Sequence, residues 1–173
     1  MITGMNHAVL YVRDARRHQT FYEDVLDFET IVADPDGAFV FLRAPGSNNH
    51  HDLACFSIGE DAANTTAGRN QVGLYHLAWE VATLGDLREQ QRRLREAGAL
   101  KAASDHGVNK SLYALDPDGL EFEVMWLTPA ELRVADEHRA VVLPLDLDAD
   151  IEKFGADRRS STHRSTDSQG STS

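Results

Sequence analysis

The stretch that decides the fold is residues 105–126, DHGVNKSLYALDPDGLEFEVMW. Its centre, DPDG, predicts a tight chain reversal, because Pro117 presets the φ angle that opens a turn and Gly119 supplies the conformation from which a strand can restart. After the turn, bulky apolar residues alternate with other residues, which is the period of a β-strand. We therefore predict a β-hairpin whose second strand places Leu120, Phe122, Val124 and Trp126 on the core face, and Glu121, Glu123 and Met125 on the opposite face.

Length and composition restrict the class of protein. A chain of 173 residues with 42% hydrophobic content can bury a core as one domain or as two small fused modules. A formal net charge of −11 argues against nucleic acid or an anionic membrane surface as partner. No apolar run is long enough to span a bilayer and the first residues do not resemble a signal peptide, so we expect a cytoplasmic location. Cys55 is the only cysteine, which excludes an internal disulfide and predicts a small core residue.

The N-terminal part of the chain has a β-α-β-β-β pattern. Asp14 is placed to cap a helix over residues 15–26, in which Phe21, Tyr22, Val25 and Leu26 fall on one side. Residues 59–72 are rich in Gly, Asn, Thr and Ala and predict a linker. The strands of this first module are predicted at residues 5–12, 28–33, 39–43 and 53–58.

The same pattern then restarts. Strands are predicted at residues 74–81 and 100–103 and in the hairpin, with a helix over residues 86–97, and His7 and His76 occupy equivalent places in the first strand of each half. A repeat of this kind fixes the architecture. We predict an α+β fold in which two paired βαβββ modules, residues 1–58 and 73–128, form a sheet that encloses a cleft.

The C-terminal part does not repeat the module. Residues 129–157 are predicted to form a helical extension, with helices over residues 130–140 and 149–154. Residues 158–173 are rich in Ser, Thr, Arg and Gln and contain no large apolar side chain. Such a composition cannot bury enough apolar surface to offset the entropy of ordering, so this tail is predicted to be disordered.

Three residues stand out for their chemistry. His7, His76 and Glu123 each lie on a predicted strand whose other face is apolar. A single strand histidine is more often a hydrogen-bonded structural residue, and a single glutamate is more often solvated. All three, however, are expected to project to the face that lines the cleft. Two imidazoles and one carboxylate form the facial triad of non-haem Fe(II) oxygenases.

The paired modules, the segment TFYEDVL at residues 20–26 and the DPDG turn together resemble the vicinal oxygen chelate superfamily. Within it, the chain is similar to single-domain type I extradiol ring-cleaving dioxygenases over residues 5–127. The resemblance implies Fe(II), with Mn(II) as the alternative, held by His7, His76 and Glu123. It also selects Glu123 over Glu121, which is left solvated near the turn. The implied substrates are O2 and a small aromatic diol of the catechol or 2,3-dihydroxybiphenyl class, and a homo-oligomer is expected.

Further matches imply catalytic roles. The segment HHDLA at residues 50–54 resembles a family motif whose histidine acts as acid and base, and His51 is the matching position. His106 and Tyr113 resemble the pair that hydrogen-bonds the substrate and oxygen-derived groups. The chain departs from the family pattern at Asp27, where Gly is usual, and at Leu120, where Asn or His is frequent.

Two other functions remain open at this point. A glyoxalase or epimerase uses the same fold, but it typically takes a fourth protein ligand or a carboxylate base from the other module, and the matching strand at residues 53–56, Leu-Ala-Cys-Phe, offers no carboxylate or amide. A metal-free protein that binds small molecules, of the bleomycin-resistance kind, would have no reason to align two histidines and a glutamate.

Overall fold

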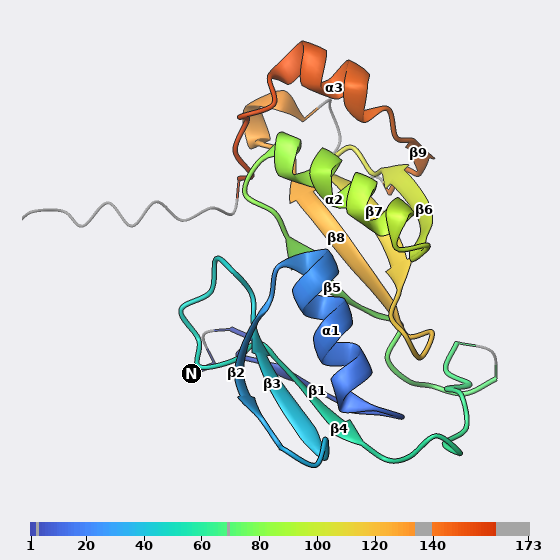
Figure 1. Ribbon diagram of the computed structural model, residues 1–173. Coiled ribbons are helices and arrows are strands. Elements are labelled where there is room, and N and C mark those ends of the chain that lie inside the picture. Colours follow the sequence, from blue (N-terminus) through green and yellow to red (C-terminus); the bar gives the residue numbers. More distant parts are fainter. Residues whose placement is uncertain (3, 69, 134–139, 162–173) are drawn as a thin grey trace, which may run out of the picture. The chain divides into compact units, whose positions relative to one another are not determined.

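The protein, described by a computed structural model for all residues except 3, 69, 134–139 and 162–173, contains two β-sheets (Figure 1). Two successive βαβββ modules and a C-terminal helix confirm the predicted α+β fold. The first module comprises β1 (Ala8–Val12), α1 (Ala15–Leu26), β2 (Glu29–Ala33), β3 (Phe39–Arg43) and β4 (Leu53–Ser57). The second comprises β5 (His76–Glu80), α2 (Leu84–Glu96), β6 (Leu100–Asp105), β7 (Asn109–Leu115) and β8 (Glu121–Leu127).

The two sheets repeat one strand order. The first runs β1-β4-β3-β2, and the second runs β5-β8-β7-β6 with β9 (Leu143–Pro144) added at its edge. In the first sheet β1 and β4 are parallel, with Leu10 opposite Cys55. Cys55 is fully buried, and burial, followed by the charges of Asp116 and Asp118, raises the pKa of its thiol to about 12. Its predicted role as a core residue is confirmed.

Helix α1 begins and ends where its capping residues place it. The carboxylate of Asp14 accepts hydrogen bonds from the backbone N–H groups of Arg16, at 2.8 Å, and Arg17, at 3.4 Å. Asp27 ends the helix with φ of 56°, the left-handed conformation that usually requires Gly. Figure 1 shows the helix lying across the four-stranded sheet. The buried residues of the helix are Ala15, His18, Tyr22, Val25 and Leu26.

The hairpin turn forms as predicted, and Asp116 organises it. Its buried carboxylate accepts hydrogen bonds from the backbone N–H groups of Asp118, at 2.9 Å, and Leu120, at 2.8 Å. Gly119 has φ of 81°, the conformation for which we expected Gly at this position. The first Asp of DPDG therefore satisfies the backbone donors of the reversal, in addition to the turn chemistry of Pro117 and Gly119.

Strand β8 is buried on its apolar face and partly buried on the other. Phe122, Val124 and Trp126 are buried as predicted, but Glu123 is also only 6% exposed. The prediction that Glu121 is solvated is wrong, because its side chain is 12% exposed and a carboxylate oxygen lies 3.7 Å from Nδ1 of His76. The face that carries both glutamates is therefore shielded from solvent at these two positions.

The chain divides into two compact units. One contains Met1–Leu77, Arg93–Leu100 and Ala114–Phe122, and the other contains Ala78–Arg92, Lys101–Tyr113 and Glu123–Ser173. The division passes through β5, α2 and the strands of the hairpin. The module boundaries predicted at residues 58 and 73 stay a prediction.

The C-terminal extension packs on the second unit. A short 3₁₀ helix (Ala130–Leu132) occupies the start of the helix predicted over residues 130–140, of which 134–139 lie outside the described residues. Helix α3 (Leu147–Phe154) follows β9. The predicted tail begins at Arg158, whose carbonyl accepts hydrogen bonds from Leu84 N, at 3.1 Å, and Trp126 Nε1, at 3.0 Å. Residues 162–173 lie outside the described part of the chain. No helix within the described ranges combines the length and apolar character that crossing a bilayer requires.

Candidate functional site

Two of the predicted site residues, His7 and His51, lie side by side in the first unit. Their ring centroids are 4.5 Å apart. His51 also stacks on Phe41 of β3, with centroids 4.8 Å apart and planes inclined by 15°. The register explains this placement, because Ala8 is opposite Leu53 and the residues just before β1 therefore run beside those just before β4.

The loop before β4 is held by polar contacts that sequence reasoning missed. The Asp52 carboxylate accepts hydrogen bonds from Ala44 N, at 2.9 Å, from Ser47 Oγ, at 2.7 Å, and from Asn49 Nδ2, at 2.8 Å. Asn49 Nδ2 also donates to the carbonyl of Asn6, at 2.9 Å. These bonds fix the residues that precede His51 and tie them to the residue that precedes His7. The sequence feature that could have indicated these contacts was the Asn-rich composition of the loop.

The environment of His51 affects its protonation. Burial, followed by the nearby imidazoles of His7 and His50, lowers the pKa of His51 below its usual value. Nδ1 of His51 lies 3.0 Å from Nδ1 of His50, so one of these nitrogens donates and the other accepts. A neutral imidazole near pH 7 is able to accept a proton, which is the chemistry of a general base.

The aromatic side chains beyond His51 continue as a cluster on the first sheet. Phe39 lies 5.3 Å from Phe41 and 5.7 Å from Phe56, measured between ring centroids. These rings are half-buried, unlike the core side chains on the opposite face of β3. The cluster offers an apolar surface of the kind against which an aromatic ring can pack.

The two remaining predicted metal ligands, His76 and Glu123, each contact a polar side chain of a neighbouring strand. His76 begins β5 and faces Glu121 at 3.7 Å. Glu123, in the second unit, accepts a hydrogen bond from Asn109 Nδ2 at 3.3 Å, and Asn109 Nδ2 also lies 2.5 Å from Ser111 Oγ. Asn109 was not recognised from the sequence, although it stands two residues before Ser111 on the same face of β7.

His106 and Tyr113 are brought together in the second unit. Nε2 of His106 lies 2.9 Å from the Tyr113 hydroxyl. His106 directly follows β6, and Tyr113 lies within β7, seven residues later. The expectation that these two residues act as a pair agrees with this contact, whereas their roles stay a prediction.

The three predicted metal ligands are divided between the two compact units. Among the residues that the structure describes, no group of three or more His, Cys, Asp or Glu side chains is placed to hold a metal ion. His7 and His76 belong to one compact unit and Glu123 to the other. The set of donors, two imidazoles and one carboxylate, fits a non-haem Fe(II) centre by its chemistry.

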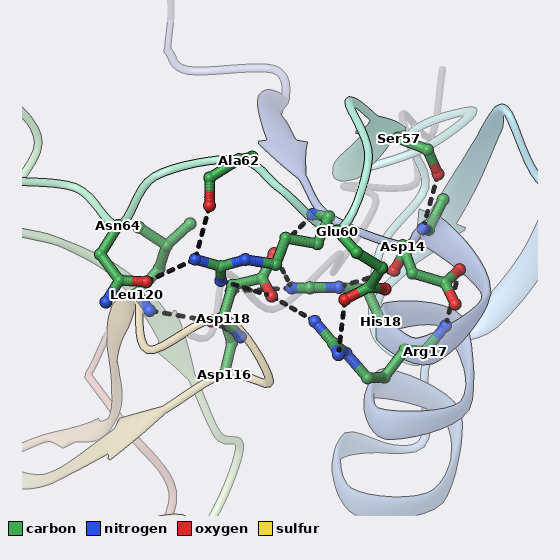
Figure 2. A network of polar contacts seen from close by, with 12 residues as sticks. Asp14, Arg17, His18, Ser57, Glu60, Ala62, Asn64, Asp116, Asp118 and Leu120 are labelled. Carbon is green, nitrogen blue, oxygen red and sulfur yellow. Dashed lines mark hydrogen bonds and ion pairs between the residues drawn. The ribbon is translucent and has the colours of Figure 1, made fainter.

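A second polar cluster, which we call the His18 cluster, was not expected from the sequence (Figure 2). It consists of Arg13, Arg17, His18, Asp116 and Asp118. His18 is fully buried, with Nδ1 3.0 Å from the Asp14 carbonyl and Nε2 3.3 Å from Asp116 Oδ2. Asp118 accepts hydrogen bonds from Arg13 N, at 2.7 Å, and from the guanidinium of Arg17. The cluster fastens the hairpin turn to the start of α1.

The charges in the His18 cluster shift the pKa values of its members. Burial disfavours the protonated form of His18, but its hydrogen bonds to Asp116 and the Asp14 carbonyl and the charges of both carboxylates outweigh burial and raise its pKa. Burial likewise acts to raise the pKa of Asp118, but the hydrogen bonds from Arg13 and the charges of His18 and Arg17 lower it. The cluster therefore favours an imidazolium at His18 and an ionised carboxylate at Asp118.

The comparison with known proteins places the chain in a family. Residues 4–124 match the sequence model of the family described as "Glyoxalase/Bleomycin resistance protein/Dioxygenase superfamily". The chain belongs to this superfamily. The resemblance that the paired modules and the DPDG turn suggested is confirmed.

Members of this superfamily with related sequences include two dioxygenases from Rhodococcus globerulus. Biphenyl-2,3-diol 1,2-dioxygenase 3 is 34% identical over 130 residues, which cover 72% of this chain and 65% of that protein. Biphenyl-2,3-diol 1,2-dioxygenase 2 is 30% identical over 114 residues, which cover 65% of this chain and 57% of that protein. The chain therefore spans less than two thirds of the length of these relatives.

A solved structure supports the fold of the superfamily. The glyoxylase/bleomycin resistance protein/dioxygenase domain from Frankia sp. EAN1pec has a TM-score of 0.63 and 23% sequence identity, covering 74% of this chain and 100% of that one. At this identity the similarity shows the fold alone.

Proposed function

We propose that the protein is an extradiol ring-cleaving dioxygenase that acts on a catechol-type vicinal diol and uses non-haem Fe(II) and O2. The observation that carries the proposal is the pair of imidazoles formed by His7 and His51, 4.5 Å apart beside an aromatic cluster. It brings a proposed metal ligand next to a proposed acid and base. The similarity to two proteins named biphenyl-2,3-diol dioxygenases supports this reaction class.

In this proposal His7, His76 and Glu123 hold the metal. Fe(II) is the first choice, and Mn(II) is the alternative. When bound, the metal would lower the pKa of a diol hydroxyl and supply the redox chemistry that O2 requires. The Asn109 amide, 3.3 Å from Glu123, would hold the carboxylate in the orientation for ligation, as hydrogen bonds around metal sites generally do.

The other residues would bind the diol and move its proton. His51 would accept a proton from a diol hydroxyl and return it to the ring-opened product, while stacking on Phe41 keeps its ring plane fixed. Phe39, Phe41 and Phe56 would pack against the aromatic ring or its substituent. Tyr113, whose hydroxyl lies 2.9 Å from Nε2 of His106, would hydrogen-bond to the second hydroxyl.

The activity is tested by loading the metal-free protein with Fe(II) under anaerobic conditions. Catechol and 2,3-dihydroxybiphenyl are then added with air, and O2 uptake and the yellow semialdehyde product are measured together. The proposal predicts that each diol consumed takes up one O2, since both oxygen atoms enter the product. A failure to consume O2 with every diol of a broad panel contradicts it.

Matched variants separate the proposed roles. Glu123→Gln is expected to lose stoichiometric iron, whereas Glu121→Gln, two residues away on the same strand, is expected to retain it, because the glutamine amide oxygen can still accept from Nδ1 of His76. His51→Ala is expected to keep iron and to lower kcat about 100-fold, the usual contribution of a general base, whereas Asn48→Ala, at an exposed position of the same loop, keeps kcat within a factor of about two. Equal iron loss in Glu121→Gln and Glu123→Gln contradicts the ligand assignment.

The same measurements distinguish the two other functions considered. A glyoxalase or epimerase would convert its substrate without consuming O2. A metal-free binding protein would bind aromatic ligands with equal affinity before and after Fe(II) is added. Isothermal titration with 2,3-dihydroxybiphenyl, with and without the metal, therefore completes the test.

A further inference from the structure

A main-chain carbonyl of the C-terminal extension makes a contact with one of the proposed catalytic residues. The carbonyl oxygen of Val141 lies 2.8 Å from Nδ1 of His106. Val141 belongs to the described part of the extension, beyond residues 4–124, which the superfamily matches. The contact is therefore a feature of this chain outside the two repeated modules.

The extension is held in place beside His106. Strand β9 pairs antiparallel with β6, with Leu143 opposite Asp105 and Pro144 opposite Ser104. A methyl group of Val141 lies over Gly107, because a Cβ built on that glycine would be 3.5 Å from Val141 Cγ2.

Helix α3, which follows β9, is anchored by a buried ammonium group. Lys110 makes an ion pair with Asp105 at the end of β6, and its Nζ lies 3.4 Å from Asp150 Oδ2 on α3. The side chain of Lys110 is only 7% exposed, so this pairing is shielded from water. The segment that follows Val141 is thus held by the pairing of β9 with β6 and by the ion pair between Lys110 and α3.

The geometry determines which ring nitrogen of His106 carries the proton. A carbonyl oxygen can only accept a hydrogen bond, so Nδ1 of His106 must be the donor. In the neutral ring Nε2 then holds a lone pair and must accept from its own partner, the hydroxyl of Tyr113 at 2.9 Å. Because the Tyr113 proton is directed to Nε2 of His106, the Tyr113 oxygen can act only as an acceptor toward any other group.

We propose that the main-chain carbonyl of Val141 is a positioning group of the active site, which fixes His106 in the Nδ1–H tautomer so that Tyr113 accepts a proton from the diol. This inference rests on the proposed function for the identity of the proton donor. As one diol proton moves to the Tyr113 oxygen, the Tyr113 proton moves to Nε2 of His106. The positive charge is then on an imidazolium whose second N–H is already hydrogen-bonded to Val141.

The tautomer can be measured without any turnover. The metal-free protein is labelled with ¹⁵N-histidine and its ring nitrogens are followed by NMR at a pH where histidine is neutral, with His106→Gln used to assign the His106 signals. The inference predicts a protonated Nδ1 and an unprotonated Nε2 for His106. A protonated Nε2, or a rapidly exchanging mixture of both forms, overturns it.

The carbonyl itself can be weakened by a single atomic change. Replacing Val142 with α-hydroxyisovaleric acid turns the 141–142 amide into an ester, whose carbonyl is a poorer hydrogen-bond acceptor. The His106 signals are expected to shift toward the mixture of tautomers, and kcat with Fe(II) and 2,3-dihydroxybiphenyl is expected to fall about fivefold, with little change in KM. The matched control is the same substitution at Val141, which weakens the carbonyl of Ala140 and is expected to leave both readouts unchanged.

The outcomes separate the two proposals. An unchanged His106 tautomer in the Val142 ester protein overturns the role of the Val141 carbonyl, whatever the activity. A shifted tautomer with unchanged kcat overturns its role in the reaction. Absence of diol turnover in the unmodified Fe(II) protein overturns the proposed function, and the tautomer assignment is then judged by the ¹⁵N spectra alone.

Discussion

Replacing the buried His18 with leucine is expected to destabilise the protein more strongly than most single substitutions. His18 is fully buried, and Nε2 lies 3.3 Å from Asp116, whose side chain is 1% exposed (Figure 2). Leucine fills a similar volume but leaves Asp116 Oδ2 buried without the imidazole, whereas Oδ1 keeps its bonds from Asp118 N and Leu120 N. A buried carboxylate that loses a charged partner costs about 2–4 kcal/mol in the free energy of unfolding.

The loss is expected to depend on pH in a defined direction. The folded-state pKa of His18 is raised above its ordinary value of 6.5 by Asp116 and Asp118, while Arg13 and Arg17 are engaged with Asp118. A raised pKa contributes stability that is fully present below 6.5 and disappears as pH rises through the folded-state pKa. The difference between the unmodified protein and His18→Leu should therefore be largest near about pH 6 and smaller at about pH 9.

Urea unfolding followed by circular dichroism, repeated across this range, measures the effect. His50→Leu is the matched control, because His50 is exposed, and its unfolding free energy should stay within about 0.5 kcal/mol of the unmodified protein at each pH. The unfolding free energy measured at acid pH provides an internal check. Asp118 has a lowered pKa, so its contribution is present above 3.8 and is lost only as pH falls through the folded-state value. If His18→Leu retains the decrease in stability on the alkaline side, the assignment to His18 is refuted.

One chemical reaction and two substitutions test other parts of the structure. The thiol of Cys55 is completely buried and has a pKa of about 12, so at about pH 8 it should react with a disulfide reagent only as fast as the protein unfolds. The reaction rate is measured in increasing urea from the thiol that the reagent releases. Asp27→Gly should raise the free energy of unfolding by about 0.5–1 kcal/mol, because relief of the left-handed conformation exceeds the loss of an exposed ion pair with Arg93; a decrease contradicts this. Lys110→Met should lower it by about 2–3 kcal/mol and increase hydrogen exchange in α3, since Asp150 loses its buried partner.

Sequence patterns predicted the helices and strands well, because capping residues and hydrophobic periodicity act within a single element. Helix α1 begins and ends at the predicted residues, since an N-cap at Asp14 and a period of 3.6 specify both its start and its buried face. Strand β3 also has the predicted bounds. The repeat of one element order predicted the two βαβββ modules, which the shared strand order of the two sheets confirms.

Contacts between distant residues were not predictable in this way. His18 was passed over because a polar residue on an amphipathic helix is normally assigned to solvent, and its partner Asp116 lies 98 positions away. The bond between Asn49 and Asn6 joins residues 43 positions apart, and that between His106 and Val141 spans 35. No periodicity encodes such pairs, since they depend on which strands become neighbours. Whether His7, His76 and Glu123 form one metal centre stays a prediction.

The two glutamates of β8 illustrate how the structure separates residues that alternation leaves equivalent. Strand β8 lies between β5 and β7 in the sheet, and Glu121 contacts His76 of β5 whereas Glu123 is bonded to Asn109 of β7. An amide donor can hold a carboxylate without competing for a metal. A carboxylate next to Nδ1 of a histidine favours the tautomer that leaves Nε2 for ligation. In the proposed centre Glu123 would therefore bind the metal and Glu121 would orient His76, which gives a function to the glutamate that the sequence had assigned to solvent.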